Sequence, residues 1–92
     1  MNDGVDGVAA AVADPVRREI LEMLRDRPLP ARRIAERFPI SRPAVSRHLR
    51  VLRECGLVRD TADGRERLYR LQPAGLAGLS DWLAGFVPAA PV

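Results

Sequence analysis

The first part of the chain carries apolar residues at the spacing of α-helices. Residues 5–13 form a short alanine-rich helix with too little apolar surface to stand alone. A second helix starts at Asp14-Pro15, because an aspartate caps free backbone N–H groups and proline fits the first helical position. It continues to about Asp26, where the sequence Arg27-Pro28-Leu29-Pro30 interrupts the helical pattern. We therefore expect two helices here, the second packed on the core.

Two more helices are predicted between residues 31 and 55. Residues 31–38 form a short third helix, and a tight link at residues 39–40 leads to Ser41, which caps a fourth helix running to Cys55. Gly56 ends this helix in a left-handed conformation. Two helices joined by so short a turn predict a helix-turn-helix at residues 31–55.

A β-hairpin and a last helix complete the predicted fold. Residues 57–61 and 66–71 are strand-like, and the turn between them contains Asp63-Gly64, a strong hairpin signal. Pro73 then begins a last helix that extends to about Phe86. We expect residues 1–92 to form one mostly α-helical domain, a winged helix-turn-helix with five helices and a two-stranded wing at residues 57–71.

The middle of the chain, residues 27–53, is strongly basic. The chain has 92 residues and a net charge of +3, a size that allows one domain with one modest core. Residues 27–53 contain eight arginines and one acid, Glu36, whereas the first fourteen residues contain three aspartates and no base. We therefore expect a polyanion to bind the middle of the chain.

The fourth helix, residues 41–55, has one apolar and one cationic face. Ala44, Val45, Leu49 and Leu52 share the apolar face. A helix of this kind fits the major groove of double-stranded DNA, with its first turns nearest the base edges. The alternative is an arginine face that contacts only solvent. We favour DNA binding, and the predicted contacts are Ser41, Arg42, Pro43, Ser46, Arg47 and Arg50, the last of them to phosphate.

Arginines outside this helix are candidates for further DNA contacts. Arg65 and Arg67 lie at or near the tip of the wing, which we expect to approach the minor groove with residues 59–67, and Arg59 on the facing strand joins them. Acidic neighbours offset this charge, so the alternative is a hairpin whose polar residues only keep it in solution. Arg32 and Arg33 on the third helix either grip the DNA backbone or simply face water.

The sequence offers little for metal, redox or enzyme chemistry. His48 projects from the apolar side of its helix, and Cys55, the single cysteine, fits a small buried hydrophobe in a reducing compartment. One histidine and one cysteine are too few ligands for a zinc site. No catalytic motif is recognisable, and no apolar run is long enough to span a membrane. We expect a cytoplasmic protein that is not an enzyme and has no metal site, no cofactor and no membrane partner.

Three stretches of the chain carry a family resemblance. They are ADPVRREILEML, ISRPAVSRHLRVLRECGLV and DGRERLYRLQPAGLAGL. Through them the chain, from about Ala11 to Leu83, resembles the ArsR family of bacterial winged-helix regulators. The resemblance implies a homodimer built from the first and last helices, at about residues 5–13 and 73–86. It also implies two recognition helices presented to a palindromic operator, and repression that a signal relieves.

Apolar residues of the first and last helices are consistent with that dimer, because they exceed what so small a core needs. The alternative is that the two helices pack only within one subunit. The predicted interface residues are Val8, Val12, Leu76, Leu79, Trp82, Leu83 and Phe86.

The chain departs from the metal-sensing members of the family. Their cysteine pair falls near the positions held here by Pro30 and Arg32, and of their last-helix ligands only Asp81 has a counterpart. The resemblance therefore implies a member without a metal site, whose inducing effector does not follow from the family. A competing hypothesis is a module whose cationic face binds an acidic protein instead of DNA, although such a helix usually shows apolar anchors.

Overall fold

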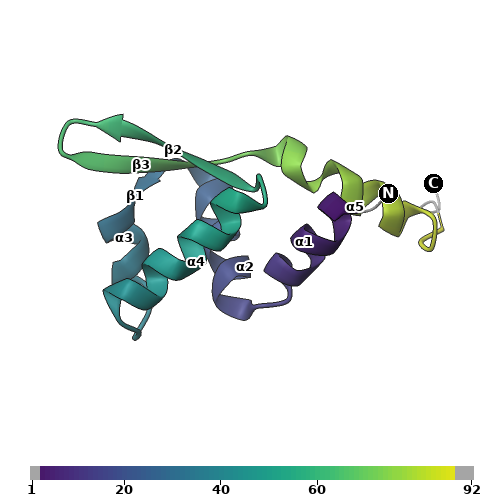
Figure 1. The fold of residues 1–92 in the computed structure, drawn as a ribbon, viewed down its shortest axis with the longest axis horizontal. Helices are drawn as coiled ribbons and strands as arrows, with labels where there is room; N and C mark the ends of the chain where they lie inside the picture. The colour runs from purple at the N-terminus through teal and green to yellow at the C-terminus, as the bar shows by residue number, and fades with distance from the viewer. Residues whose placement is uncertain (1–2, 89–92) are drawn as a thin grey trace.

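The computed structural model describes residues 3–88, which form five α-helices, one short 3₁₀ helix and one small antiparallel sheet. In chain order the elements are α1 (Asp3–Val12), α2 (Pro15–Asp26), β1 (Leu29–Pro30), α3 (Ala31–Glu36), α4 (Arg42–Glu54), β2 (Val58–Asp63), β3 (Glu66–Leu71), η1 (Pro73–Leu76) and α5 (Ala77–Ala84). The predicted mostly helical winged helix-turn-helix is confirmed. Figure 1 shows the β2–β3 hairpin at one end and α1 beside α5 at the other.

The helix ends follow the local signals in the sequence. The Asp14 carboxylate accepts hydrogen bonds from the backbone N–H groups of Val16, at 2.8 Å, and Arg17, at 3.1 Å, and so caps α2. At the far end of α4, Gly56 has a φ of 76° and Leu57 donates its N–H to the carbonyl of Leu52 at 2.9 Å. Among residues 3–88 no helix is both long and apolar enough to cross a membrane.

The sheet contains a third strand that the sequence analysis did not predict. The wing strands β2 and β3 pair from Val58 opposite Leu71 to the tip, and β1 adds to the free edge of β3 with Leu29 opposite Tyr69. This two-residue segment had been interpreted only as a break between helices. It is too short to show strand alternation, and its proline fits an edge strand because the edge needs no donor there.

The core lies where α2, α3 and α4 meet the base of the sheet. Ile20, Ile34 and Leu52 are each fully buried, and Leu49 retains 2% of its surface. Two of these residues come from the apolar face of α4, which fixes the rotation of that helix about its axis. The opposite face of α4 must therefore point to solvent.

The predicted last helix is divided into two parts. Residues Pro73–Leu76 form the 3₁₀ helix η1, and α5 begins only at Ala77. Here Gly75 packs directly on the backbone of Gly56, since a Cβ at Gly75 would lie 2.1 Å from the Gly56 carbonyl oxygen. This long-range contact leaves no trace in the helical pattern of residues 73–86.

Candidate nucleic-acid interface

Helix α4 presents the residues that the sequence predicted for DNA contact. Its N-cap is Ser41, whose hydroxyl accepts a hydrogen bond from the Ala44 N–H at 3.2 Å, and Arg42 and Pro43 form its first turn. Because Val45, Leu49 and Leu52 are buried, the residues of the other face are exposed. These exposed residues are Ser41, Arg42, Pro43, Ser46, Arg47, Arg50, Arg53 and Glu54.

The arginines near this surface differ in their partners. Within residues 3–88, Arg42, Arg47, Arg50 and Arg65 form no salt bridge and donate no side-chain hydrogen bond. Their guanidinium groups are therefore available to phosphates or base edges.

Three other predicted contacts are already paired with acids. Arg32 on α3 forms a salt bridge with Glu66 on the wing. Nη1 of Arg33 lies 3.8 Å from Oε1 of Glu36 on the same helix. Arg67 donates from Nε to the Asp60 carboxylate at 3.0 Å. All three arginine side chains remain more than half exposed, so these pairs hold them in place without burying them.

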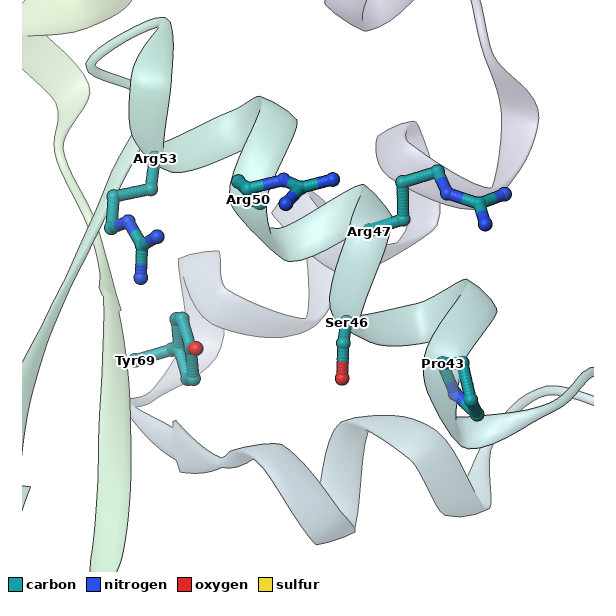
Figure 2. Close-up of a pocket in the computed structure, with 6 residues that line it drawn as sticks. All are labelled: Pro43, Ser46, Arg47, Arg50, Arg53 and Tyr69. Atoms are coloured by element: carbon teal, nitrogen blue, oxygen red, sulfur yellow. The ribbon is translucent and has the colours of Figure 1, made fainter.

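A shallow hollow of about 420 Å³ lies between α4 and the sheet. Its lining residues are Pro43, Ser46, Arg47, Arg50, Arg53 and Tyr69. Figure 2 shows the Arg53 guanidinium directed toward Tyr69, while Arg47 and Arg50 extend away from that residue. A neighbouring hollow of about 330 Å³, between α3, the start of α4 and the wing, is also lined by Tyr69 together with Arg42 and Arg65.

Tyr69 and Arg53 are site residues that the sequence analysis missed. The cationic face predicted for the fourth helix includes Arg53, but no contact is predicted for it. The pattern of residues 66–71 indicates only that Tyr69 lies in a strand. The signal for Tyr69 was strand alternation, which puts it on the same face of β3 as Arg67. Burial, followed by the nearby Asp60 carboxylate, raises the pKa of the Tyr69 hydroxyl above its usual value, so the group remains a neutral donor.

Asp60 connects the outer, arginine-rich face of α4 to the wing. Its carboxylate is 10% exposed, accepts from Arg67 and lies 3.7 Å from Nη1 of Arg53. In the sheet Asp60 is the cross-strand partner of Tyr69. One acid thus holds an arginine from α4 and an arginine from β3 beside the same tyrosine.

The suggestion that Arg59 joins Arg67 is wrong. Arg59 pairs with Arg70 across the hairpin, whereas Arg67 pairs with Ala62. Alternate residues of a strand point to opposite faces, so Arg59 lies on the face of the sheet away from Arg67 and Tyr69. Of the predicted wing residues, Arg65 and Arg67 are the ones near α4.

The predicted dimer residues occupy one end of the molecule, but they differ in exposure. Val8 is 4% exposed and belongs to the core of the chain itself, and Val12, Leu76 and Leu79 are partly buried against that core. The other three predicted interface residues remain exposed: Trp82 is 50% exposed, Leu83 is 45% exposed and Phe86 is 69% exposed. Val87, which was not predicted, lies next to them and is 64% exposed.

His48 and Cys55 make contacts within the fold. His48 Nδ1 lies 3.1 Å from Nη1 of Arg17, and the Cys55 thiol donates to the Gly7 carbonyl oxygen at 3.4 Å. Across residues 3–88, no three histidine, cysteine, aspartate or glutamate side chains are grouped as metal ligands. Asp81, the one counterpart of a family metal ligand, is exposed on α5.

Comparison with known proteins gives matches over most of the chain. Residues 14–60 match the family described as bacterial regulatory protein, arsR family. The transcriptional regulator Rv2034 of Mycobacterium tuberculosis is 49% identical over 69 residues, which are 75% of this chain but 64% of that protein, so the chain spans less than two thirds of it. The transcriptional repressor SdpR of Bacillus subtilis is 34% identical over 90% of this chain and 92% of its own. A crystal structure of the ArsR family transcriptional regulator RHA00566 superposes with a TM-score of 0.87 and 27% identity, covering 94% of this chain and 89% of that one.

Proposed function

The chain belongs to the ArsR family of bacterial transcriptional regulators, which are not enzymes, and from that premise we propose that it is a homodimeric repressor of a palindromic DNA operator. The observation that carries the proposal is the outer face of α4. Its arginines Arg42, Arg47 and Arg50 have no acidic partner within residues 3–88, while the inner face of the same helix is anchored in the core.

In the proposed complex α4 lies in the major groove. Residues in the first turns of a recognition helix meet base edges, which assigns base contact to Arg42, Ser46 and Arg47. Arg50 and Arg53, further along the helix, contact phosphate together with the Tyr69 hydroxyl. Arg65 at the tip of the wing approaches the adjacent minor groove, and Arg32 and Arg33 flank the backbone.

Homodimerisation is supported by the apolar surface of α5 and of the turn after it, which contains Phe86. Trp82, Leu83 and Phe86 remain about half exposed or more, although α5 already packs on α1. An exposed apolar cluster of this size on a small chain is typical of a subunit interface. Repression is supported by SdpR, which is named a transcriptional repressor.

The test is selection of bound duplexes from a random-sequence DNA library, followed by binding titrations at several salt concentrations. We expect a palindrome whose half-sites are about one helical turn, roughly 34 Å, apart. Affinity should fall steeply with salt, because arginines that neutralise phosphates release counterions. A duplex and its scrambled version bound equally at every salt concentration would contradict sequence-specific regulation.

The alternative partner, an acidic protein, has weaker support. An interaction helix is anchored by apolar side chains, and the exposed face of α4 consists of serines, a proline, arginines and one acid, Glu54. Recovery of no duplex at all from the library, with a well-folded dimer, would favour that alternative.

A further inference from the structure

Arg17 joins three parts of the fold through one guanidinium group. From the first turn of α2, its Nε donates to the carbonyl oxygen of Ala11 at 2.8 Å and its Nη2 donates to that of Ala10 at 3.3 Å. Its Nη1 lies 3.1 Å from Nδ1 of His48 on α4. The side chain therefore connects the end of α1 to the recognition helix.

The contacts with α1 meet a general need of helix ends. The last four carbonyl groups of an α-helix lack partners within the helix and carry its partial negative charge. No basic residue lies in the last turn of α1 itself. Arg17 supplies donors from outside, and the adjacent Arg18 donates to the Val12 carbonyl oxygen at 2.8 Å. Both arginines therefore cap α1, but within residues 3–88 Arg18 makes no hydrogen bond to α4.

The contact with His48 defines the state of the imidazole ring. A guanidinium group has donors and no acceptor, so Nδ1 of His48 must accept the hydrogen bond. The proton of the neutral ring is then on Nε2. Arg17 thus holds one ring nitrogen of the residue that directly follows Arg47, the central arginine of the DNA-facing surface.

We propose that Arg17 is a positioning residue for DNA recognition, whose guanidinium group ties His48, and with it the rotation of α4, to the capped end of α1. This inference rests on the proposed DNA-binding function and adds to it the side chain that links the dimerisation helix to the recognition helix. A second polar contact joins α4 to α1 at its other end, where the Cys55 thiol donates to the Gly7 carbonyl oxygen at 3.4 Å. The Arg17 link lies nearer the first turns of α4, and it selects their orientation.

Arg18 provides a matched control for the DNA-binding test. Arg17→Ala and Arg18→Ala each remove one positive charge and a side chain that caps α1, by two hydrogen bonds in Arg17 and by one in Arg18. Only Arg17→Ala removes the contact with α4. The affinity of Arg17→Ala for the palindromic duplex recovered by selection should be at least about fivefold lower than that of Arg18→Ala. His48→Ala should lose a similar factor, and the double variant should lose no more than either single one, because the two residues act through each other.

The chain has one histidine, which makes the ring state directly observable in the untagged, DNA-free protein. Long-range ¹H–¹⁵N spectra should show the Nε2–H tautomer in the wild type and in Arg18→Ala, and a mixture of tautomers in Arg17→Ala. An Nδ1–H tautomer in the wild type would overturn the inference. Should Arg17→Ala fail to fold, Arg17→Lys keeps the charge but loses the planar fork and takes its place, with the same expected loss of affinity.

The outcomes separate this inference from the function on which it rests. If the wild type binds no selected duplex, the proposed function fails, whatever the tautomer. If the wild type binds and the Arg17 and Arg18 variants lose affinity equally, regulation by DNA binding stands and the positioning role of Arg17 is refuted.

Discussion

Arginine side chains on the proposed DNA-binding surface, formed by the outer face of α4 and the wing, divide according to what their guanidinium groups contact. Arg47 has no acidic partner within residues 3–88, whereas Arg67 is held by Asp60 at 3.0 Å. The Asp60 carboxylate is 10% exposed, so a phosphate that draws Arg67 away leaves a largely buried charge with one arginine partner fewer. The unpaired group offers its full charge and geometry from the start, and it is therefore the better candidate for reading a base.

Replacing Arg47 tests this difference. We expect Arg47→Ala to cost about 1–3 kcal/mol of binding free energy on the selected duplex and less on a scrambled duplex, because a base contact is lost. The melting temperature should hardly change, since the side chain is exposed. Arg25→Ala is the control, because Arg25 is an exposed arginine on α2 and its removal changes the net charge equally. An equal loss on both duplexes would assign Arg47 to phosphate instead.

A second residue-scale prediction concerns the acid between the wing and α4. The Asp60 carboxylate contributes to the raised pKa of Tyr69, after burial, which is the larger cause. In Asp60→Asn we therefore expect the pKa of Tyr69 to fall, because this negative charge is lost while Arg53 and Arg67, which lower the pKa, remain. Tyr69 is the single tyrosine of the chain, so its ionisation can be followed by ultraviolet absorption. Asp63→Asn, at the exposed tip of the wing, should leave the titration unchanged, and a similar fall in both variants would contradict the assignment.

At the scale of elements, sequence patterns predicted what is local and missed what depends on distant contacts. The caps at Asp14, Ser41 and Gly56 mark helix ends through neighbouring residues, so the boundaries of α2 and α4 followed from the sequence. Strand β1 and the site residue Tyr69 depend on the pairing of segments about forty residues apart. The pairs that Arg32 and Arg67 make with wing acids likewise depend on the packing and register of the wing, which no single-segment pattern reveals.

The contact between Gly75 of η1 and Gly56 at the end of α4 can be tested by a substitution. A Cβ at Gly75 would lie 2.1 Å from the carbonyl oxygen of Gly56, a backbone atom that cannot rotate away. We expect Gly75→Ala to lower the free energy of unfolding by about 1–3 kcal/mol, because overpacking displaces η1 from α4.

Gly4→Ala is the matched control for Gly75→Ala, and both are measured by thermal or chemical denaturation. A Cβ at Gly4 meets nothing within 4 Å, and alanine favours the helix there by up to about 1 kcal/mol. Equal stability of the two variants would show that the contact at Gly75 relaxes freely.

At the scale of the whole molecule, the proposed DNA-binding surface and the exposed apolar surface lie toward opposite ends of a molecule whose longest extent is 45 Å. The hairpin and the first turns of α4 are toward one end, and α5 is at the other (Figure 1). The exposed Trp82 lies on α5, and the exposed Phe86 lies in the turn after it. A two-fold axis near α5 would therefore leave both copies of α4 free. Separation of the two surfaces is what a dimer reading two half-sites requires, because joining subunits then covers none of the DNA contacts.

The exposed apolar end gives the last prediction, in which assembly and DNA binding are lost together. Trp82 and Phe86 are in contact, with ring centroids 4.7 Å apart and ring planes tilted by 55°, and both remain at least half exposed, so a partner subunit would bury both. We expect the wild type to sediment as a dimer and Phe86→Glu to sediment as a monomer, because a charge at the centre of an apolar interface is costly to desolvate. Trp82 is the single tryptophan, and its fluorescence should shift to the red in the variant as water reaches the ring. The monomer should also bind the palindromic duplex much more weakly than the dimer, since two linked half-site contacts reinforce each other.

The control for this experiment is Ile40→Glu, which places the same charge on an exposed apolar residue in the turn before α4, away from α5. That variant should remain a dimer with unchanged tryptophan emission. A wild-type protein that stays monomeric up to high micromolar concentration and still binds the palindrome with full affinity would contradict the role assigned to α5. In that case each half-site would be read independently, and the exposed aromatic pair would need a partner other than a second copy of the chain.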